Sequence, residues 1–232
     1  MIGRTSSKID VVQPLCNGVI SNFDLAQYLI SHYLKKISAS KVFMPRVVVS
    51  VPCKITEVEK RAVVDAISSA GVRKICLIEE PVAAAMGAGV DISAPHGTFV
   101  VDIGGGTTDM AVISLNGIAI SDSIPIAGDA FNDAIIKYIR RKYGVAIGER
   151  TAEDAKIAIG CAYPKRVLET YTVKGIHTVK GLPQSLEVTS DELMEALIEP
   201  AMQIVRKVQA TLDVTPPELL ADILTDGMVL TG

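Results

Sequence analysis

Three consecutive glycines stand between two acidic residues in the segment Asp102-Ile-Gly-Gly-Gly-Thr-Thr-Asp109. Glycine allows backbone N–H groups to turn towards a bound anion, as phosphate-binding loops require. The two carboxylates suit a phosphate tail whose Mg²⁺ is held largely through water by carboxylate oxygen. The segment therefore predicts a site for nucleotide phosphates, although a glycine-rich hairpin with acidic flanks would have the same pattern.

The strands on either side of this segment decide which kind of phosphate loop it is. Residues 98–103 and 108–115 have strand patterns, and Asn116-Gly117 is a strong hairpin signal before a third strand over residues 118–126. A P-loop needs Gly-Lys-Ser/Thr followed by a helix, and a Rossmann fingerprint also leads from a strand into a helix. Because this loop joins two strands expected to be antiparallel, both common nucleotide motifs are excluded.

The elements before the loop predict a partial α/β domain over residues 1–95. Thr56 and Glu59 have the spacing of a capping box at the start of a helix. The expected elements are a helix over residues 23–37, parallel strands over 46–51 and 74–78 with a helix between them, and a helix from Pro81.

A turn-rich stretch at residues 93–97 marks the expected boundary, and residues 96–232 are predicted to form a second domain with a small insertion at about 163–190. After the sheet, we expect a helix that begins at Asp129 and another that runs from a Thr151 cap to about Ala162. A hairpin over residues 167–189 should follow. The expected elements after it are a helix capped by Ser190, a helix from Pro200 to Leu212, a short helix that begins at Pro216-Pro217 and a strand over residues 228–232.

The composition excludes several classes of protein. With 232 residues, 49% of them hydrophobic and 21% charged, the chain is neither disordered nor collagen-like. Its net charge of −3 argues against a nucleic-acid partner. The four cysteines lack close pairs, which argues against zinc and disulfides and favours a reducing cytosol. No apolar run approaches the ~20 residues needed to span a bilayer, so we expect a protein that is neither secreted nor transmembrane.

Several further segments have the form of known family motifs. They are Ile78-Glu79-Glu80-Pro81 with Ala83-Ala84-Ala85, the loop Asp102 to Asp109, Gly148-Glu149-Arg150-Thr151-Ala152-Glu153 with Lys156 and Ile159-Gly160, Thr215-Pro216-Pro217-Glu218-Leu219 with Ala221-Asp222-Ile223, and Val229-Leu230-Thr231-Gly232. On these residues the chain resembles the actin and heat-shock chaperone ATPase superfamily and, within it, the MreB family of bacterial actin-like cell-shape proteins. The resemblance implies an actin-like α/β ATPase fold.

The resemblance also implies roles for individual residues. It places Gly104, Gly105, Gly106 and Thr107 on the phosphates of ATP, Asp102 near Mg²⁺, and Glu153, Asp154, Ala155, Lys156 and Gly232 at the adenosine. Glu80 would orient the attacking water with Thr107 as its companion, a role that suits a carboxylate. Without the resemblance, Glu80 could be a carboxylate favoured by a helix N-terminus, and Glu153 and Lys156 could form a solvated helix face.

The chain also departs from the family pattern. No segment matches the family's first phosphate hairpin, Asp-x-Gly-Thr-x-x-Thr, and the chain stops at Gly232, where an adenosine loop should begin. We therefore expect a fragment with a loose first half, since two parallel strands rarely persist alone. Losing about three charge-assisted bonds of roughly 1.5–3 kcal/mol each predicts an impaired ATPase that binds ATP weakly at best.

An apolar loop between basic residues predicts contact with a membrane surface. Val42 and Phe43 lie in a segment flanked by Lys35, Lys36, Lys41 and Arg46. The resemblance implies that this segment is an insertion loop, with Val42 and Phe43 at the lipid boundary. Without the family, Phe43 could instead lie in the core of the first domain.

The function that the resemblance implies is ATP-dependent assembly with copies of itself into filaments. These would lie in the cytoplasm, peripheral at the inner face of the cell membrane, and would guide the cell-wall elongation machinery so that a rod shape is kept. Two alternatives remain open at this point. They are a chaperone-type ATPase domain and a non-enzymatic fragment that retains only partner contacts.

Overall fold

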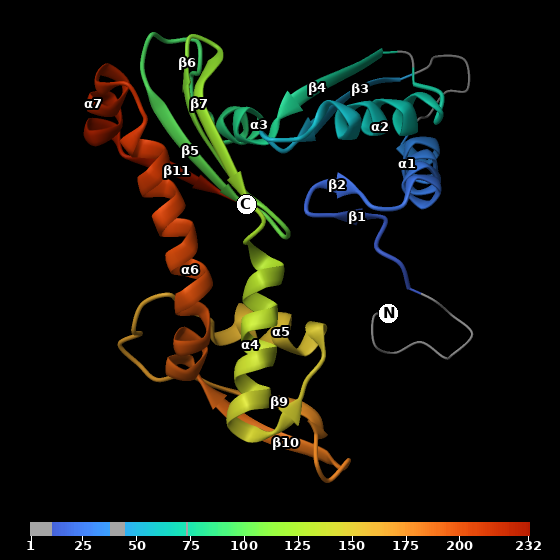
Figure 1. Cartoon of the computed structure of the whole chain (residues 1–232), viewed down its shortest axis with the longest axis vertical. Helices are drawn as coiled ribbons and strands as arrows, with labels where there is room; N and C mark the ends of the chain where they lie inside the picture. The colour runs from blue at the N-terminus through green and yellow to red at the C-terminus, as the bar shows by residue number, and fades with distance from the viewer. Residues whose placement is uncertain (1–10, 38–44, 73) are drawn as a thin grey trace. The chain divides into compact units, whose positions relative to one another are not determined.

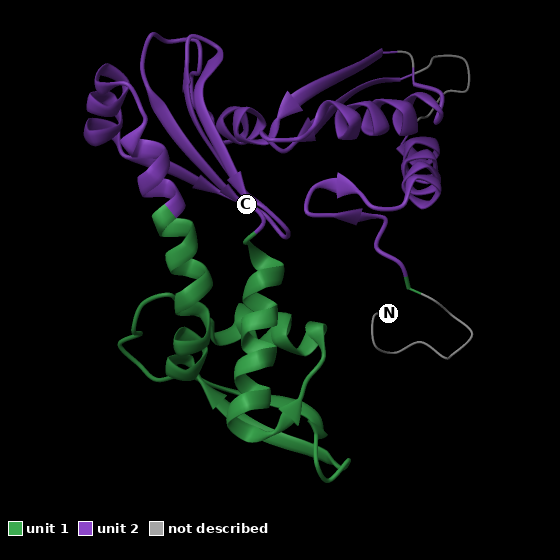
Figure 2. Cartoon of the chain, viewed as in Figure 1, with its two compact units in different colours: residues 1–11, 126–206 green, residues 12–125, 207–232 purple. Residues whose placement is uncertain are grey.

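The computed structural model describes residues 11–37, 45–72 and 74–232 (Figure 1). They form two compact units (Figure 2). Unit 1 contains Val11 and residues 126–206, and unit 2 contains residues 12–125 and 207–232. The predicted boundary between residues 95 and 96 lies inside unit 2, and the predicted insertion at 163–190 lies inside unit 1. That division into domains stays a prediction.

Unit 2 is built on a four-stranded sheet in the order β11-β5-β6-β7 (Figure 1). Its strands are β5 (Thr98–Ile103), β6 (Thr108–Ser114), β7 (Gly117–Ile124) and β11 (Met228–Thr231). The strands β5, β6 and β7 are antiparallel, as the sequence predicts, and β11 runs parallel to β5.

Both faces of this sheet are covered at β5 and β6, which explains the nearly continuous apolar sequences of these two strands. Phe99 and Val101 of β5 pack with Ile223 of α7 (Pro217–Asp226) on one face. Val100, which points the opposite way because side chains alternate along a strand, packs with Ala85 of α3 (Glu80–Gly87) on the other. The sheet is therefore a fixed support for the loop between β5 and β6.

The β6–β7 turn differs by one residue from the prediction. Leu115 and Asn116 have φ of 51° and 60°, so they are the two central residues of the turn, and Ser114 pairs with Gly117. The register shifts at a bulge between Val112 and Ile113, so that Ile113 pairs with Ile118 next to the turn.

The remaining part of unit 2 contains a two-stranded parallel sheet, as predicted, and a hairpin that the sequence reasoning missed. The sheet pairs β3 (Arg46–Val51) with β4 (Lys74–Glu79), and α1 (Phe23–Ile37) and α2 (Glu57–Ser68) accompany it. The predicted capping box at α2 is confirmed, because Thr56 and Glu59 each accept a hydrogen bond from the other's backbone N–H.

The missed hairpin joins β1 (Leu15–Cys16) to β2 (Val19–Ile20). Its two turn residues, Asn17 and Gly18, have φ of 50° and 74°, the left-handed conformation that an Asn-Gly pair favours. That dipeptide was the available signal in the sequence.

Unit 1 packs helices against a small antiparallel sheet. The elements are α4 (Gly128–Tyr143), β8 (Val145–Ala146), α5 (Glu149–Ile159), β9 (Thr170–His177), β10 (Pro183–Thr189) and α6 (Ser190–Asp213), whose last residues, from 207 onwards, belong to unit 2. The sheet has the order β10-β9-β8, and the predicted hairpin within residues 167–189 is confirmed as β9–β10. Ile135, Val173 and Leu193 lie in its core at 0% exposure.

Two predicted helix starts in this unit are wrong. The helix α5 begins at Glu149, because the carbonyl of Gly148 already accepts a hydrogen bond from Ala152, so Thr151 lies inside the helix. It ends at Ile159 because Gly160 is extended. Ser190 is the first residue of α6, and Thr189 caps the helix instead.

The predicted break at Pro200 is also wrong, since α6 is a single helix of 24 residues. A proline inside a helix costs about 3 kcal/mol because it removes a hydrogen bond and crowds the preceding turn. Leu193, Leu197 and Ile204 are all buried on this helix, at 0%, 6% and 6% exposure. Their burial on both sides of Pro200 outweighs the local penalty.

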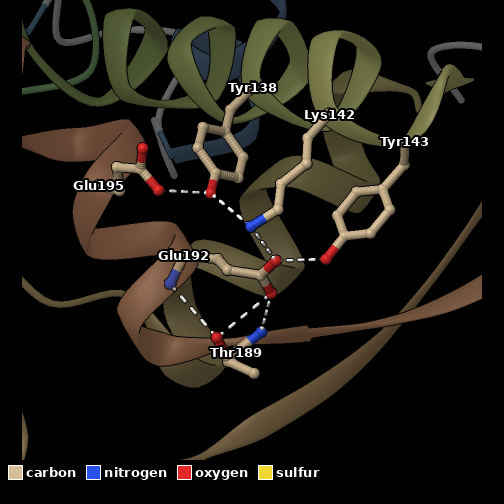
Figure 3. A network of polar contacts seen from close by, with 6 residues as sticks. All are labelled: Tyr138, Lys142, Tyr143, Thr189, Glu192 and Glu195. Atoms are coloured by element: carbon tan, nitrogen blue, oxygen red, sulfur yellow. Dashed lines mark hydrogen bonds and ion pairs between the residues drawn. The ribbon is translucent and has the colours of Figure 1, made fainter.

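A network of polar side chains ties α4 to the start of α6 (Figure 3). Glu192 accepts hydrogen bonds from Lys142 Nζ at 2.8 Å, from the Thr189 N–H at 2.8 Å and from the Tyr143 hydroxyl. Glu195 accepts a further bond from the Tyr138 hydroxyl at 2.6 Å. Burial acts to raise the pKa of Glu192, but the bonds from these donors outweigh it and lower the pKa to about 2.

Replacing the Glu192 carboxylate should destabilise the chain in a pH-dependent way. We expect Glu192→Gln to lose about 1–3 kcal/mol of unfolding free energy at pH 7, because three donors lose a charged acceptor. The folded pKa of Glu192 lies below its ordinary value, so this stabilisation is complete above about pH 4.5 and is lost as pH falls towards 2. Urea unfolding at several pH values measures the unfolding free energy. The control is Asp191→Asn, which changes an exposed neighbouring carboxylate. Equal midpoints for parent and Glu192→Gln at pH 7 would contradict this account.

Within the described ranges, no helix is both long and apolar enough to cross a bilayer.

Candidate functional site

The loop between β5 and β6 is a tight hairpin connection held by the sheet. The Gly104 N–H donates to the carbonyl oxygen of Thr107 at 2.9 Å, which closes the turn. Cross-strand pairing places Asp102 directly opposite Asp109, so the two acidic flanks of the glycines lie side by side. The sequence predicted a hairpin between antiparallel strands framed by these two residues, and the register confirms it.

Of the three glycines, Gly106 is the one that the surrounding space requires. None of them has φ in the left-handed region. A Cβ on Gly106 would lie 2.8 Å from the Asn17 Cα, because the turn of the β1–β2 hairpin packs against the loop. A Cβ on Gly105 would meet no atom within 4 Å. The loop therefore contacts a neighbour at Gly106 and is open at Gly105.

An open pocket of about 650 Å³ lies at this loop, within the size range of small-molecule sites. All of its walls belong to unit 2. The lining residues are Gly18, Ser50, Glu80, Ala83, Ala84, Gly87, Ala88, Asp102, Gly104, Gly105, Gly106, Thr107, Thr231 and Gly232. The predicted phosphate residues, Glu80, Asp102 and Gly232 are thus brought together around one cavity.

The small side chains of α3 and the end of β11 shape this pocket. Ala83, Ala84 and Gly87 present little more than backbone, so α3 leaves room beside the loop. Thr231 donates its hydroxyl to Asp102 Oδ1 at 2.9 Å, which fixes that carboxylate at the rim. Gly232 has φ of 122°, and a Cβ there would lie 2.1 Å from the carbonyl oxygen of Ile103. Only glycine fits at this position.

The donor set at the pocket suits Mg²⁺ bound together with phosphate. The described residues contain no group of three or more metal-ligating side chains. Mg²⁺ in nucleotide sites needs only one or two carboxylates, because waters and phosphate oxygens complete its shell. Asp102, with one oxygen engaged by Thr231, meets that requirement.

Asp109 is the most buried acidic residue of the site, at 1% exposure. Its Oδ1 accepts a hydrogen bond from the Cys53 N–H at 2.9 Å, whereas Oδ2 is buried without a partner among the described residues. Burial and the nearby carboxylates, Asp109 first, raise the pKa of the Cys53 thiol to about 12, so this thiol stays protonated.

Glu80, the first residue of α3, has a strongly perturbed carboxyl group. Its burial, followed by the negative charges of Asp109 and Asp102, raises the pKa of Glu80 to about 7. A carboxyl group with a pKa near neutrality can exchange a proton at physiological pH, which is the property of a general base.

The predicted adenosine residues lie in unit 1, on α5. Lys156 Nζ donates to Glu153 Oε2 at 2.8 Å, and Asn132 of α4 donates to the same oxygen at 2.7 Å. Asp154 pairs with Arg150 at 3.9 Å, and Ala155 is fully buried in the core. The role of Asp154 and Ala155 at a nucleotide stays a prediction.

The sequence reasoning missed Gly18, which lines the pocket, and Asn17, which packs against Gly106. It also missed Asn132, which has no motif around it. The predicted membrane residues, Val42 and Phe43, lie outside the described residues.

Comparison with known proteins identifies the family. The family model described as MreB/Mbl protein matches residues 1–232. The chain belongs to the MreB/Mbl family. It is 46% identical to the cell shape-determining protein MreB of Escherichia coli (strain K12) and 43% identical to the cell shape-determining protein Mbl of Bacillus subtilis (strain 168). Each match covers the whole of this chain, which spans 67% of that MreB and 70% of that Mbl.

Solved structures confirm the predicted actin-like fold. The crystal structure of MreB 5 of Spiroplasma citri bound to AMPPNP matches 99% of this MreB/Mbl chain with a TM-score of 0.94 and 37% identity, and the match covers 69% of that chain. The MamK double helical filament has a TM-score of 0.78 at 19% identity over 94% of this chain and 65% of that one, which supports the fold alone. The chain thus spans about two thirds of the length of its relatives.

Because the pKa of Glu80 is raised, Glu80 should make the fold less stable as pH rises, whereas Glu192 should make it more stable. The folded state favours the protonated carboxyl, so the parent should lose stability as pH rises from about 4.5 through about 7. Glu80→Gln keeps the shape and removes the charge, so we expect it to be about 1–2 kcal/mol more stable than the parent at pH 8, with the advantage vanishing below pH 4.5.

Denaturant titrations at pH 4.5 and pH 8 measure this difference, and Glu79→Gln in the adjacent position is the matched control. If the difference in unfolding free energy between the parent and Glu80→Gln is the same at pH 4.5 and pH 8, the pKa of Glu80 is not raised by folding.

Proposed function

We propose that this MreB/Mbl chain is an adenine-nucleotide-binding, actin-like polypeptide that assembles with copies of itself into membrane-associated filaments guiding cell-wall synthesis. The observation that carries the proposal is the pocket at the β5–β6 loop, where Glu80, Asp102 and Thr107 meet three glycines. Family membership favours this function over a chaperone-type ATPase. Two structures of MreB5 of Spiroplasma citri, one bound to AMPPNP and one bound to ADP, support a nucleotide as the ligand.

Each pocket residue would have a separate role in binding or hydrolysing the phosphates. The backbone of residues 104–107 would cradle the phosphates of ATP, and Asp102 would hold Mg²⁺, which screens the phosphate charge. Glu80 would orient a water molecule and accept its proton, since the raised pKa makes its carboxylate a competent base near pH 7. Thr107, half-buried beside it, would fix the same water from the loop side.

Gly105 offers a direct test of the phosphate cradle. A methyl group there meets nothing within 4 Å and needs no unusual φ, so Gly105→Ala should fold as the parent does. Because the methyl would occupy the pocket, we expect the Kd for Mg-ATP to rise at least about tenfold, a loss of roughly 1.4 kcal/mol. Calorimetric titration into the millimolar range measures this effect.

The matched control is Gly117→Ala, whose added Cβ would meet only the Ser114 carbonyl oxygen at 3.6 Å, outside the pocket. Sedimentation of the same proteins with and without Mg-ATP extends the test to assembly. Unaltered Mg-ATP affinity in Gly105→Ala would place the phosphates elsewhere. If the protein sediments equally with and without Mg-ATP, its assembly does not depend on ATP.

We further propose that Val42 and Phe43 contact the inner surface of the cell membrane. Replacing both with serine should weaken binding to anionic liposomes modestly, because burying two such side chains contributes roughly 3–5 kcal/mol before ordering costs. The control is Val179→Ser with Leu182→Ser, a second exposed apolar pair at 88% and 62% exposure. Liposome flotation measures the binding. If both double variants lose the same amount of liposome binding, the effect is not specific to Val42 and Phe43.

A further inference from the structure

The turn of the β1–β2 hairpin packs against the glycine loop between β5 and β6. A Cβ on Gly106 would lie 2.8 Å from the Asn17 Cα, 2.9 Å from Asn17 Oδ1 and 3.1 Å from the Asn17 nitrogen. The backbone and the side chain of Asn17 therefore fill the space beside Gly106 together. The neighbouring Gly105 has no atom within 4 Å of its Cβ position. The loop is thus in contact with protein at Gly106 and free to contact a ligand at Gly105.

The hairpin is held in place at both of its ends, so its turn can act as a fixed support. Val19 of β2 packs in the core around β3 and β4. The Ser21 N–H donates to the carbonyl oxygen of Pro14 at 2.9 Å, which closes the open end of the hairpin. At the turn, a Cβ on Gly18 would lie 2.5 Å from the Cγ of the buried Pro52, so the two residues are in direct contact.

The segment that begins at Pro52 is attached in turn to β6, the strand that follows the glycine loop. The Cys53 N–H donates to Asp109 Oδ1 of that strand at 2.9 Å. Three contacts therefore link the loop, the hairpin and this segment into a closed arrangement, namely Gly106 with Asn17, Gly18 with Pro52, and Cys53 with Asp109. A closed arrangement of this kind limits how far the loop can move away from the hairpin.

A loop of three glycines needs such a limit if it is to bind phosphate well. Glycine loses more conformational freedom on ordering than any other residue. Ordering a mobile loop on binding lowers affinity, and a loop that is ordered beforehand avoids that loss. Gly18 also lines the pocket, so the hairpin turn borders the ligand site itself. The contact between Asn17 and Gly106 is therefore in the right place to order the loop before a ligand arrives.

We propose that Asn17 is a positioning residue, which holds residues 104–107 in their phosphate-binding conformation through its contact with Gly106. The inference rests on the proposed nucleotide-binding function. Asparagine suits this position because its φ of 50° is left-handed, a conformation that asparagine adopts more readily than most residues. Glycine would adopt the same conformation, but it would leave part of the space beside Gly106 empty.

The variant Asn17→Gly keeps the turn and removes the side chain that contacts Gly106. The hydrogen bond from the Gly104 N–H to the Thr107 carbonyl oxygen reports whether the loop is closed. In the absence of ligand, we expect the Gly104 amide hydrogen to exchange with solvent at least about fivefold faster in this variant, as measured by NMR. An unchanged rate would overturn the positioning role.

Two further variants separate this role from a general effect on turns. Asn116→Gly makes the same change in the β6–β7 turn, where φ is 60°, and it should leave the exchange of Gly104 unchanged. Asn17→Asp has nearly the same shape as the parent side chain and should restore the slow exchange. Equal acceleration in Asn17→Gly and Asn116→Gly, or no rescue by Asn17→Asp, would show that the side chain of Asn17 does not hold the loop.

Phosphate affinity provides the second measurement. The probe is magnesium tripolyphosphate, which has no nucleoside and so tests the loop alone. We expect Asn17→Gly to raise its Kd about tenfold in calorimetric titration, because the loop must then be ordered on binding. Asn116→Gly should bind as the parent does. Equal affinities for the parent and Asn17→Gly would contradict the proposed role in phosphate binding.

The exchange measurement uses no ligand, so the inference and the proposed function can fail separately. If the parent binds neither magnesium tripolyphosphate nor Mg-ATP, the proposed function fails, and the exchange of Gly104 alone decides whether Asn17 holds the loop. If the parent binds both ligands while Gly104 exchanges equally in the parent and in Asn17→Gly, the proposed function stands and the positioning role of Asn17 fails.

Discussion

The buried carboxylate of Asp109 is the constraint on which the pocket depends. It lies on β6 next to the glycine loop, at 1% exposure, and its Oδ1 accepts the Cys53 N–H from the loop that follows β3. This bond joins the two-stranded sheet of β3 and β4 to the four-stranded sheet. Since α3 begins directly after β4, the same bond helps to set where Glu80 lies relative to the loop. The neighbouring residue strengthens the junction, because Lys54 Nζ lies 2.5 Å from Asp122 on β7.

Much of this arrangement could be predicted from local patterns. The strand patterns on either side of the glycines predicted β5 and β6 as antiparallel neighbours, and their pairing confirms it. The capping box of Thr56 and Glu59 is likewise a local interaction between residues three apart. Family motifs then pointed to Glu80 and Asp102, which the fold brings to one pocket.

The parts that could not be predicted depend on contacts between distant residues. Pro200 has the local signature of a helix start, and only the burial of Leu197 and Ile204 around it keeps α6 continuous. Asn132 has no motif around it, and its hydrogen bond to Glu153 joins residues 21 positions apart in the chain. The contact between Gly106 and Asn17 is equally non-local, although the Asn-Gly turn itself could have been recognised.

The charges on the four-stranded sheet distinguish its structural acidic residue from its functional ones. Asp122 forms ion pairs with both Lys54 and Lys207, and these donors lower its pKa despite its partial burial. In the part of the chain that the structure describes, no lysine or arginine forms an ion pair with Asp102 or Asp109, although the two lie opposite each other, an arrangement that like charges disfavour.

The uncompensated charge at the loop is therefore an electrostatic cost, and it adds to burial in raising the pKa of Glu80. Under the proposed function, Mg²⁺ would neutralise this charge on binding, while the backbone N–H groups of the loop would meet the phosphates. A lysine at the loop would stabilise the empty pocket, but it would also remove much of the attraction for a divalent cation. Lys54 and Lys207 instead form ion pairs with Asp122 on β7, which leaves the pocket acidic.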